Sequence, residues 1–369
     1  MAQQTNGSHP SAVSDSKAHK FNPDFTRAVI NATGPKAAPR TRQLAASLIQ
    51  HLHDFARENE LTVDEWMAGV ELVRFHALFP RSRWRASTGR CHRTHTHMSQ
   101  VNAAGRMSDD KRNEGQLLCD VLGLESLVDE ITYKLASDAA DEPTATAILG
   151  PFYRHNAPEL PMGGCIVAGL PKDVADKGDR TWMHGTVTDF RTGKPIEGAV
   201  MDVWHTAPNG LYEQQDPEQP EMNLRGRFTT GKDGKYNFYC LRPVPYPIPF
   251  DGPAGKVLQA LDRHPMRPAH IHFLVCCTLQ SGKVLVQGRL IQQQLKAPGY
   301  KPIITQIFDR KSKYIEDDAV FAVKDSLLVD FIPFEGDPKA EFELPYDFKM
   351  ASFEDAKSLA GATPASASL

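Results

Sequence analysis

The sequence predicts an α+β protein, in which an N-terminal helical region is followed by an antiparallel β-sandwich. Up to about residue 142, apolar residues recur at the spacing of one helix face, as at Leu44, Leu48, Leu52 and Phe55. Beyond that point the chain has short alternating segments between Gly and Pro turns, and most of its 27 prolines fall there. Many short strands separated by such turns are typical of two packed sheets.

The helical region is expected to span residues 21–142, after a polar, unstructured tail at residues 1–20. Thr62 and Glu65 have the spacing of a capping box, so a helix should begin there. Further helices are expected at residues 21–30, 37–58, 108–122 and 125–135.

The sandwich is expected to span residues 143–350, and an Ala/Ser-rich flexible tail should follow at residues 351–369. Asp233 and Gly234 separate two alternating runs, which predicts a hairpin. Strands are expected at residues 182–188, 199–205, 226–230 and 235–240.

Composition narrows the function classes. The formal net charge of −3 argues against a protein that binds nucleic acid by charge. No apolar run is long enough for a membrane span, and the first 20 residues lack the apolar core of a signal peptide. The six cysteines are scattered, which is typical of reduced thiols in a cytoplasmic protein.

The segment RPAHIHF, residues 267–273, carries the sharpest chemical signal. Residues two apart on a strand share a face, so His270 and His272 should point the same way. Two imidazoles placed in this manner can hold one metal ion. The ordinary alternative is a pair of histidines on a polar sheet face.

Two tyrosines are candidate partners of these histidines. Tyr246 lies in the proline-stiffened segment RPVPYPIP, residues 242–249, and Tyr212 ends the segment PNGLY, residues 208–212. A bound cation removes the proton of a coordinating phenol, and an oxidised iron favours oxygen anions. Two phenolates and two imidazoles would leave ferric iron with a single net positive charge. Tyrosines in such segments otherwise serve as packing residues.

Four motifs, taken together, resemble those of the intradiol ring-cleavage dioxygenases. They are LGPFY at 149–153, VWHTAPNGLY at 203–212, PYPIP at 245–249 and RPAHIH at 267–272; DGP at 251–253 and TQI at 305–307 also match. The resemblance extends over about residues 20–350, apart from two unusual segments described below.

This resemblance implies a non-haem Fe(III) enzyme that opens a catechol ring with O2 between its hydroxylated carbons, in aromatic compound catabolism. It implies that Tyr212, Tyr246, His270 and His272 hold the iron and that Tyr246 yields its place to the substrate. Arg267 would place a fixed positive charge near the ring, and Gln306 would orient a ligand from the outer shell. A surface salt bridge is the ordinary alternative for Arg267. The family also implies a homodimer built from the N-terminal helices.

The substrate is expected to be a small aromatic diol or triol. The LGPF and PIP segments look more like those of enzymes acting on hydroxyquinol (benzene-1,2,4-triol) than on catechol; the product would be maleylacetate from hydroxyquinol or cis,cis-muconate from catechol. Asp120, one helical turn after Leu117, is a candidate acceptor for a third hydroxyl; a solvated helix residue or a cap is the alternative. The expected substrate-binding residues are Leu117, Asp120, Leu149, Gly150, Pro151, Phe152, Tyr153, Ile248, Pro249 and Arg267.

Residues 73–100 and 276–295 do not fit their surroundings. The first segment has six Arg, four His and no acidic residue, and the second has five Gln. Each begins at or just after a Val, whose codons start with GT, and ends near a Gln or Lys, whose codons can end in AG. We interpret both as translated introns of a eukaryotic gene model. Surface insertions, which loops tolerate, are the alternative.

Three other functions stay open at this point. His270 and His272 fit a zinc or Fe(II) site, although no Asp or Glu stands at a matching spacing for the Fe(II) class. A β-sandwich can also be a non-catalytic binding module of the transthyretin type. Finally, the two unusual segments are compatible with an inactive product of a mis-spliced gene model.

Overall fold

The computed structural model describes residues 24–78, 103–109, 111–133, 142–170, 177–276, 283–286, 289–292 and 299–355. The polar tail at residues 1–20 and most of both unusual segments lie outside this part of the chain. In the second segment the backbone of β8 (Lys283–Val286) pairs with that of β9 (Arg289–Gln292) in an antiparallel ladder.

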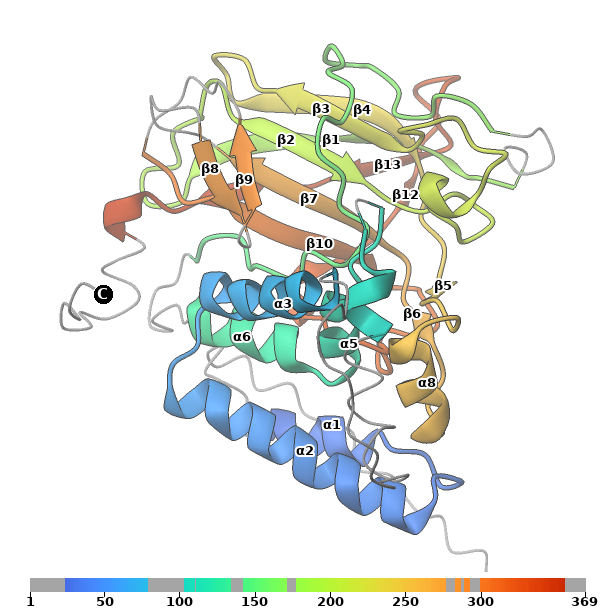
Figure 1. Ribbon diagram of the computed structural model, residues 1–369. Helices are drawn as coiled ribbons and strands as arrows, with labels where there is room; N and C mark the ends of the chain where they lie inside the picture. The colour runs from blue at the N-terminus through green and yellow to red at the C-terminus, as the bar shows by residue number, and fades with distance from the viewer. Residues whose placement is uncertain are drawn as a thin grey trace, which may run out of the picture.

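The N-terminal region is helical, as expected, and its helices gather on one side of the sheets (Figure 1). Thr62 caps α3: the side chain of Glu65 accepts from the Thr62 backbone at 3.0 Å, which confirms the capping box. The helix expected at 108–122 begins later, at Glu114, because Asn113 is its N-cap and accepts from the backbone of Gln116. The helices are α1 (Phe25–Asn31), α2 (Pro39–Glu58), α3 (Val63–Leu78), α5 (Glu114–Val121), α6 (Leu124–Thr132) and α8 (Pro253–Ala260).

Two five-stranded sheets form the sandwich, which confirms the fold class. One sheet has the order β12-β13-β1-β14, with β4 also paired to β1, and the other has the order β11-β10-β7-β2-β3. Most pairs are antiparallel, whereas β1 runs parallel to β13 and β14, and β10 runs parallel to β11. The strands of the first sheet are β1 (Arg180–Asp189), β4 (Lys235–Leu241), β12 (Ile332–Pro333), β13 (Phe342–Pro345) and β14 (Phe348–Met350). Those of the second are β2 (Val200–Trp204), β3 (Arg225–Thr229), β7 (His270–Cys276), β10 (Ile303–Asp309) and β11 (Leu328–Val329).

The hairpin predicted at Asp233–Gly234 is wrong. The tight turn exists, with Gly234 at φ +67°, but β3 pairs with β2 and β4 pairs with β1. The turn therefore connects the two sheets across the edge of the sandwich. A turn signal specifies local backbone geometry and leaves the choice of strand partner to the packing of the sheets.

Strand β7 separates the hydrophobic core from the other face of its sheet. Ile271, Phe273 and Val275 pack in the core between the two sheets. His270 and His272 point to the opposite face, which the helices and the loops before β1 cover, and both are only 2% exposed. The alternation expected from the sequence is thus observed, on a strand buried on both faces. No helix in the described part of the chain is both long and apolar enough to cross a bilayer.

Candidate active site

The four side chains proposed as ligands converge on one point of the second sheet. The hydroxyl oxygens of Tyr212 and Tyr246 are 3.4 Å apart, and Nε2 of His272 lies 3.1 Å from the Tyr212 hydroxyl. Nε2 of His270 in turn lies 3.1 Å from Nε2 of His272. Metal–ligand bonds of roughly 2.0–2.2 Å place neighbouring donor atoms about 3 Å apart, so these four tips have the spacing of one coordination sphere.

Both imidazoles direct Nε2 at this point. The Nδ1–H of His270 donates to the carbonyl oxygen of Pro268 at 2.7 Å, which leaves Nε2 as the unprotonated nitrogen. Burial, followed by the charge of Arg267, holds the pKa of His270 well below its ordinary value. Burial likewise lowers the pKa of His272. The unprotonated Nε2 of His270 faces Nε2 of His272 and lies close to the two phenol oxygens, and this set of nitrogen and oxygen donors fits a metal ion.

The register of three strands positions the histidines. His272 on β7 is paired with Trp204 on β2 and with Gln306 on β10. The Trp204 indole stacks on the His272 ring, with centroids 4.7 Å apart and planes 9° from parallel. On the other side Gly150 approaches closely: its φ is +77°, and a Cβ there would lie 3.3 Å from Cε1 of His272. Glycine is therefore required at this position of the LGPFY segment.

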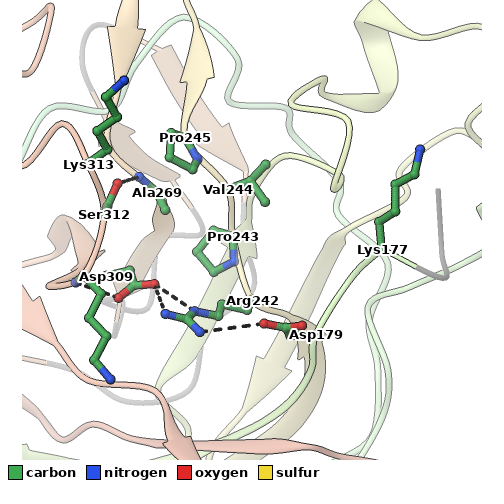
Figure 2. Close-up of a pocket in the computed structure, with 11 residues that line it drawn as sticks. Lys177, Asp179, Arg242, Pro243, Val244, Pro245, Ala269, Asp309, Ser312 and Lys313 are labelled. Atoms are coloured by element: carbon green, nitrogen blue, oxygen red, sulfur yellow. Dashed lines mark hydrogen bonds and ion pairs between the residues drawn. The ribbon is translucent and has the colours of Figure 1, made fainter.

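Tyr246 reaches the site from a loop that is anchored at its start (Figure 2). Arg242 begins the proline-rich segment and donates from Nε to Asp309 at 2.8 Å, at the end of β10. Asp179 lies 3.7 Å from the other side of the guanidinium. Tyr246 itself starts β5 (Tyr246–Pro247), which pairs with β6 (Met266–Arg267) and places Tyr246 opposite Arg267.

A cavity of about 240 Å³ opens beside this loop and is bordered by Lys177 and Lys313. Their ammonium groups point away from the cavity in Figure 2, and two carboxylates compensate the charge of Arg242. We therefore assign this region to support of the Tyr246 loop.

Tyr212 is fixed by packing and by the segment that follows it. Its ring lies 4.8 Å from that of Phe152, centroid to centroid, and its backbone nitrogen donates to the side chain of Gln215. The guanidinium of Arg225 lies 5.8 Å over the Tyr212 ring and is itself paired with Glu213. Burial, followed by the nearness of Tyr246, raises the pKa of Tyr212 well above its ordinary value. A phenol so placed ionises only when a cation stabilises its oxygen.

Arg267 lies at the edge of the four donors, where it is only 2% exposed. Its Nη1 is 3.1 Å from Nε2 of His270, and its Nη2 donates to Oε1 of Gln306 at 2.7 Å. A surface salt bridge, the ordinary alternative for this residue, is therefore wrong. Burial opposes the charge of Arg267, but Asp318 and the two tyrosines raise its pKa above the ordinary value.

Gln306 connects Arg267 to the loop before β1. Its Oε1 accepts from Arg267, and its Nε2 donates to the carbonyl oxygen of Ile148 at 2.7 Å. The outer-shell contact with a metal ligand expected from the sequence is thus indirect, through Arg267 to His270. The role assigned to Gln306 stays a prediction.

The residues expected to bind substrate form two adjoining groups. Leu149, Phe152 and Tyr153 pack with Tyr212 and Tyr246, and Leu117 and Ile248 pack in a neighbouring cluster. Tyr153 donates to Asp202 at 3.1 Å, so its hydroxyl supports the loop rather than joining the four donors. Three further residues that are not predicted from the sequence belong to this region: Trp204, Val320 and Asp318.

Asp120 lies on α5 and is 1% exposed. Burial, followed by the charge of Glu125, raises the pKa of Asp120 well above its ordinary value. The solvated helix residue considered as an alternative is therefore wrong. Glu125 accepts from Gln116 and from the backbone nitrogen of Leu149, which ties the helical layer to the LGPFY segment.

Carboxylates and thiols do not provide the donors here. In the described ranges, no group of three or more His, Cys, Asp or Glu side chains is arranged to hold a metal. The zinc and Fe(II) alternatives both rest on such groups. The donors that gather at this point are two phenols and two imidazoles.

Comparison with known proteins identifies the family. A family model described as dioxygenase matches residues 148–352, and one described as catechol dioxygenase N terminus matches residues 38–74 and 96–140. An intradiol ring-cleavage dioxygenase of Aspergillus niger is 42% identical over 332 residues, which cover 90% of this chain and 89% of the relative. The chain belongs to the intradiol ring-cleavage dioxygenases. It is therefore an enzyme of this class and not a carrier of the transthyretin type.

Two further comparisons place this dioxygenase within the family. A catechol 1,2-dioxygenase of Candida albicans is 40% identical, with 92% of this chain and 96% of the relative covered. The crystal structure of a hydroxyquinol 1,2-dioxygenase from Pseudomonas putida matches with a TM-score of 0.55 and 32% identity, over 89% of this chain and 97% of that one. The N-terminal family model leaves residues 75–95 unmatched, within the first unusual segment.

Proposed function

We propose that this dioxygenase cleaves the ring of a catechol-type aromatic between its two hydroxylated carbons, with O2 and with ferric iron held by Tyr212, Tyr246, His270 and His272. The observation that carries the proposal is the convergence of four donor tips from three separate segments, at successive separations of 3.4, 3.1 and 3.1 Å. Relatives named for catechol and hydroxyquinol support the substrate class.

The iron, when bound, would act as a Lewis acid and as a template for the two substrate oxygens. By the resemblance to the family, Tyr246, which stands in the short strand β5 opposite Arg267, would be the ligand that yields its place to the substrate. Its phenolate would accept a proton at the hydroxyl oxygen from an incoming diol. Arg267, fixed beside His270, would hold a positive charge where the substrate ring becomes electron-rich. Phe152 and Leu149 would help to exclude water from the ring.

A specific feature favours hydroxyquinol as substrate. Asp120 is buried next to Glu125 and has a pKa well above its ordinary value, so its carboxyl group can be neutral. A neutral carboxyl group both donates and accepts a hydrogen bond, which suits the third hydroxyl of a triol. Catechol has no third hydroxyl to form this hydrogen bond, so it should bind less favourably.

The test is O2 consumption with catechol and hydroxyquinol side by side, using the iron-loaded chain and a version without residues 73–100 and 276–295. We expect a visible tyrosinate-to-iron absorption band and ring-opened product from at least one of these two proteins. Tyr246→Phe should abolish or strongly shift the band. Absence of both band and O2 uptake would contradict the function, and an unchanged spectrum in the variant would remove Tyr246 from the ligand set.

We further propose that α2 forms a homodimer interface. Leu44, Leu48 and Phe55 lie on one face of this helix and are 45%, 51% and 54% exposed, an unusual state for three large apolar side chains. The double substitution of Leu48 and Phe55 by Glu should halve the mass measured by light scattering, whereas Gln50→Glu, on the opposite face, should leave it unchanged. A monomeric unmodified chain would contradict this interface.

We keep the proposed domain limits, residues 21–142 for the helical region and 143–350 for the sandwich. We also keep the interpretation of the two unusual segments as translated introns. Residues 73–100 and 276–295 are translated introns, and the unmatched stretch at 75–95 supports the first. Sequencing the mature transcript tests this directly, since the presence of either segment would overturn it. The free thiols of Cys119, Cys165 and Cys240 support a cytoplasmic location.

A further inference from the structure

We propose that Asp318 is a positioning residue of this dioxygenase, whose carboxylate fixes the orientation of the Arg267 guanidinium at the active site. Asp318 lies in the connection between β10 and β11, 51 residues after Arg267 in the chain. It is 6% exposed, and its role as a residue acting through Arg267 rests on the function proposed above.

The carboxylate of Asp318 is held by its own loop as well as by Arg267. Oδ1 accepts from Nε of Arg267 at 3.1 Å and from the backbone nitrogen of Val320 at 3.2 Å. Oδ2 accepts from Nη2 of Arg267 at 3.2 Å and from the backbone nitrogen of Ala322 at 3.1 Å. Each oxygen therefore takes one guanidinium proton and one backbone proton. A side chain fixed in this way has little freedom, so it can fix a partner.

The contacts of Arg267 leave Nη1 of its guanidinium facing the proposed active site. The group has five N–H donors in a rigid plane. Asp318 binds the edge formed by Nε and Nη2, and Gln306 takes a second proton of Nη2 at 2.7 Å. Nη1 is thereby directed toward Nε2 of His270, at 3.1 Å. Without Asp318, rotation about the side-chain torsions of Arg267 would move Nη1 away from this place.

The negative charge of Asp318 also offsets the free-energy cost of burying the positive charge of Arg267. The side chains of the pair are 3% and 2% exposed, and an unpaired charge at that depth is costly. Substitution of Asp318 by Asn would also be disruptive. The NH2 group of Asn would face one guanidinium N–H and one backbone N–H, both of which donate to a carboxylate oxygen in the unmodified chain. The same carboxylate orders Val320, which packs with Leu117 and Ile248 of the predicted substrate pocket.

The experiment compares the unmodified chain with Asp318→Ala, Arg267→Met and the double variant, each loaded with iron. We expect Asp318→Ala to lower kcat by roughly 10- to 100-fold, with a smaller change in KM and an unchanged visible absorption band. In the Arg267→Met background the same substitution should lower kcat by less than twofold, because the guanidinium through which Asp318 acts is gone. Asp330→Asn, in an exposed pair with Arg310, is the matched control and should change neither constant.

A second readout does not depend on turnover. With 15N-labelled arginine, the Nε–H signal of Arg267 is assigned by its loss in Arg267→Met. Its exchange with water should be at least about tenfold faster in Asp318→Ala and unchanged in Asp330→Asn. The proposal is overturned by an unchanged exchange rate, by unchanged kcat, or by an equal loss in both backgrounds. If the unmodified chain opens no ring, the proposed function fails instead. The exchange rate still shows whether Asp318 fixes the guanidinium of Arg267.

Discussion

The β-sandwich and the helical layer contribute to the active site in different ways. In the sandwich, backbone register places the side chains: pairing of β7 with β2 and β10 sets His272 between Trp204 and Gln306. In the helical layer, buried side-chain contacts do so: Glu125 on α6 accepts from Gln116 on α5 and from the backbone of Leu149. In the proposed site, the placement of the two histidine ligands would thus depend on the sheet ladder, and recognition of the ring would depend on a few hydrogen bonds.

This difference predicts how each region responds to substitution. A ligand on β7 can be removed with little change to the ladder, since the backbone bonds remain. A buried polar group in the helical layer is part of the layer's own hydrogen bonding, so its loss affects binding and stability together. Substitutions in the sheet should therefore lower activity with little loss of stability, whereas those in the helices should lower both.

The largest effect is expected from His272→Ala. Removal of one imidazole takes away a ligand that is 3.1 Å from both His270 and Tyr212, so iron content, visible absorption and ring cleavage should all be lost. We expect activity to fall on the order of 10³-fold or more, with an unfolding midpoint close to that of the iron-free unmodified chain. Elemental analysis and O2 uptake measure this.

His184→Ala is the matched control for this change. His184 lies on β1 in the other sheet, paired with Glu343 near the surface, and its loss should leave iron binding intact. A His272→Ala variant that binds iron as the unmodified chain does would contradict the ligand set. Unfolding of that variant would contradict the separation of chemistry from folding in the sheet.

A smaller effect is expected from Asp120→Ala in the helical layer. Loss of the carboxyl removes a hydrogen-bond partner for a third substrate hydroxyl, so the ratio of kcat/KM for hydroxyquinol over catechol should fall about tenfold, or about 1.4 kcal/mol. Asp120→Asn keeps a donor and an acceptor and should retain most of this preference. Parallel kinetics on both substrates decide the matter, and an unchanged ratio in the Ala variant would exclude Asp120 from substrate selection.

The sequence predicts local patterns well and distant partners poorly. Alternation on residues 267–273 is sufficient to place His270 and His272 on one face, as the structure confirms. The tyrosines were found through resemblance, because no spacing relates Tyr212 to Tyr246. Asp318 and Trp204 were missed, since their roles arise only when separate segments pack together, and one Asp in a loop carries no periodic signal.

The same limit explains the error at the turn between β3 and β4. Asp233 and Gly234 specify a tight reversal, and Gly234 adopts the expected positive φ. Which strand each arm pairs with is decided by the core between the sheets, where Phe228 and Phe238 stack at 4.8 Å from opposite sheets. Local geometry was predictable, and sheet membership required the tertiary fold.

A different kind of effect, on stability rather than on activity, is expected in the helical region at His53 on α2. Its imidazole is fully buried; its Nε2–H donates to the carbonyl oxygen of Leu122 at 2.9 Å, and its Nδ1 accepts from the hydroxyl of Thr26 at 3.0 Å. Burial lowers the pKa of His53 to about 4 from 6.5. The unfolded chain therefore binds a proton more readily, and the stability contributed by neutral His53 is complete above pH 6.5 and is lost as the pH falls toward 4.

Between pH 7.5 and pH 5 this residue alone should cost about 2 kcal/mol of the free energy of unfolding. His53→Gln should lower stability at pH 7.5 and show a correspondingly weaker loss on acidification, measured by guanidinium unfolding followed by circular dichroism. His51→Gln, at an exposed position of the same helix, should keep the pH dependence of the unmodified chain. The other buried histidines are common to all three proteins, so the difference isolates His53. An identical pH dependence in the His53 variant would mean that this imidazole is protonated as easily in the folded as in the unfolded chain, and that the helical layer does not depend on its neutral buried groups.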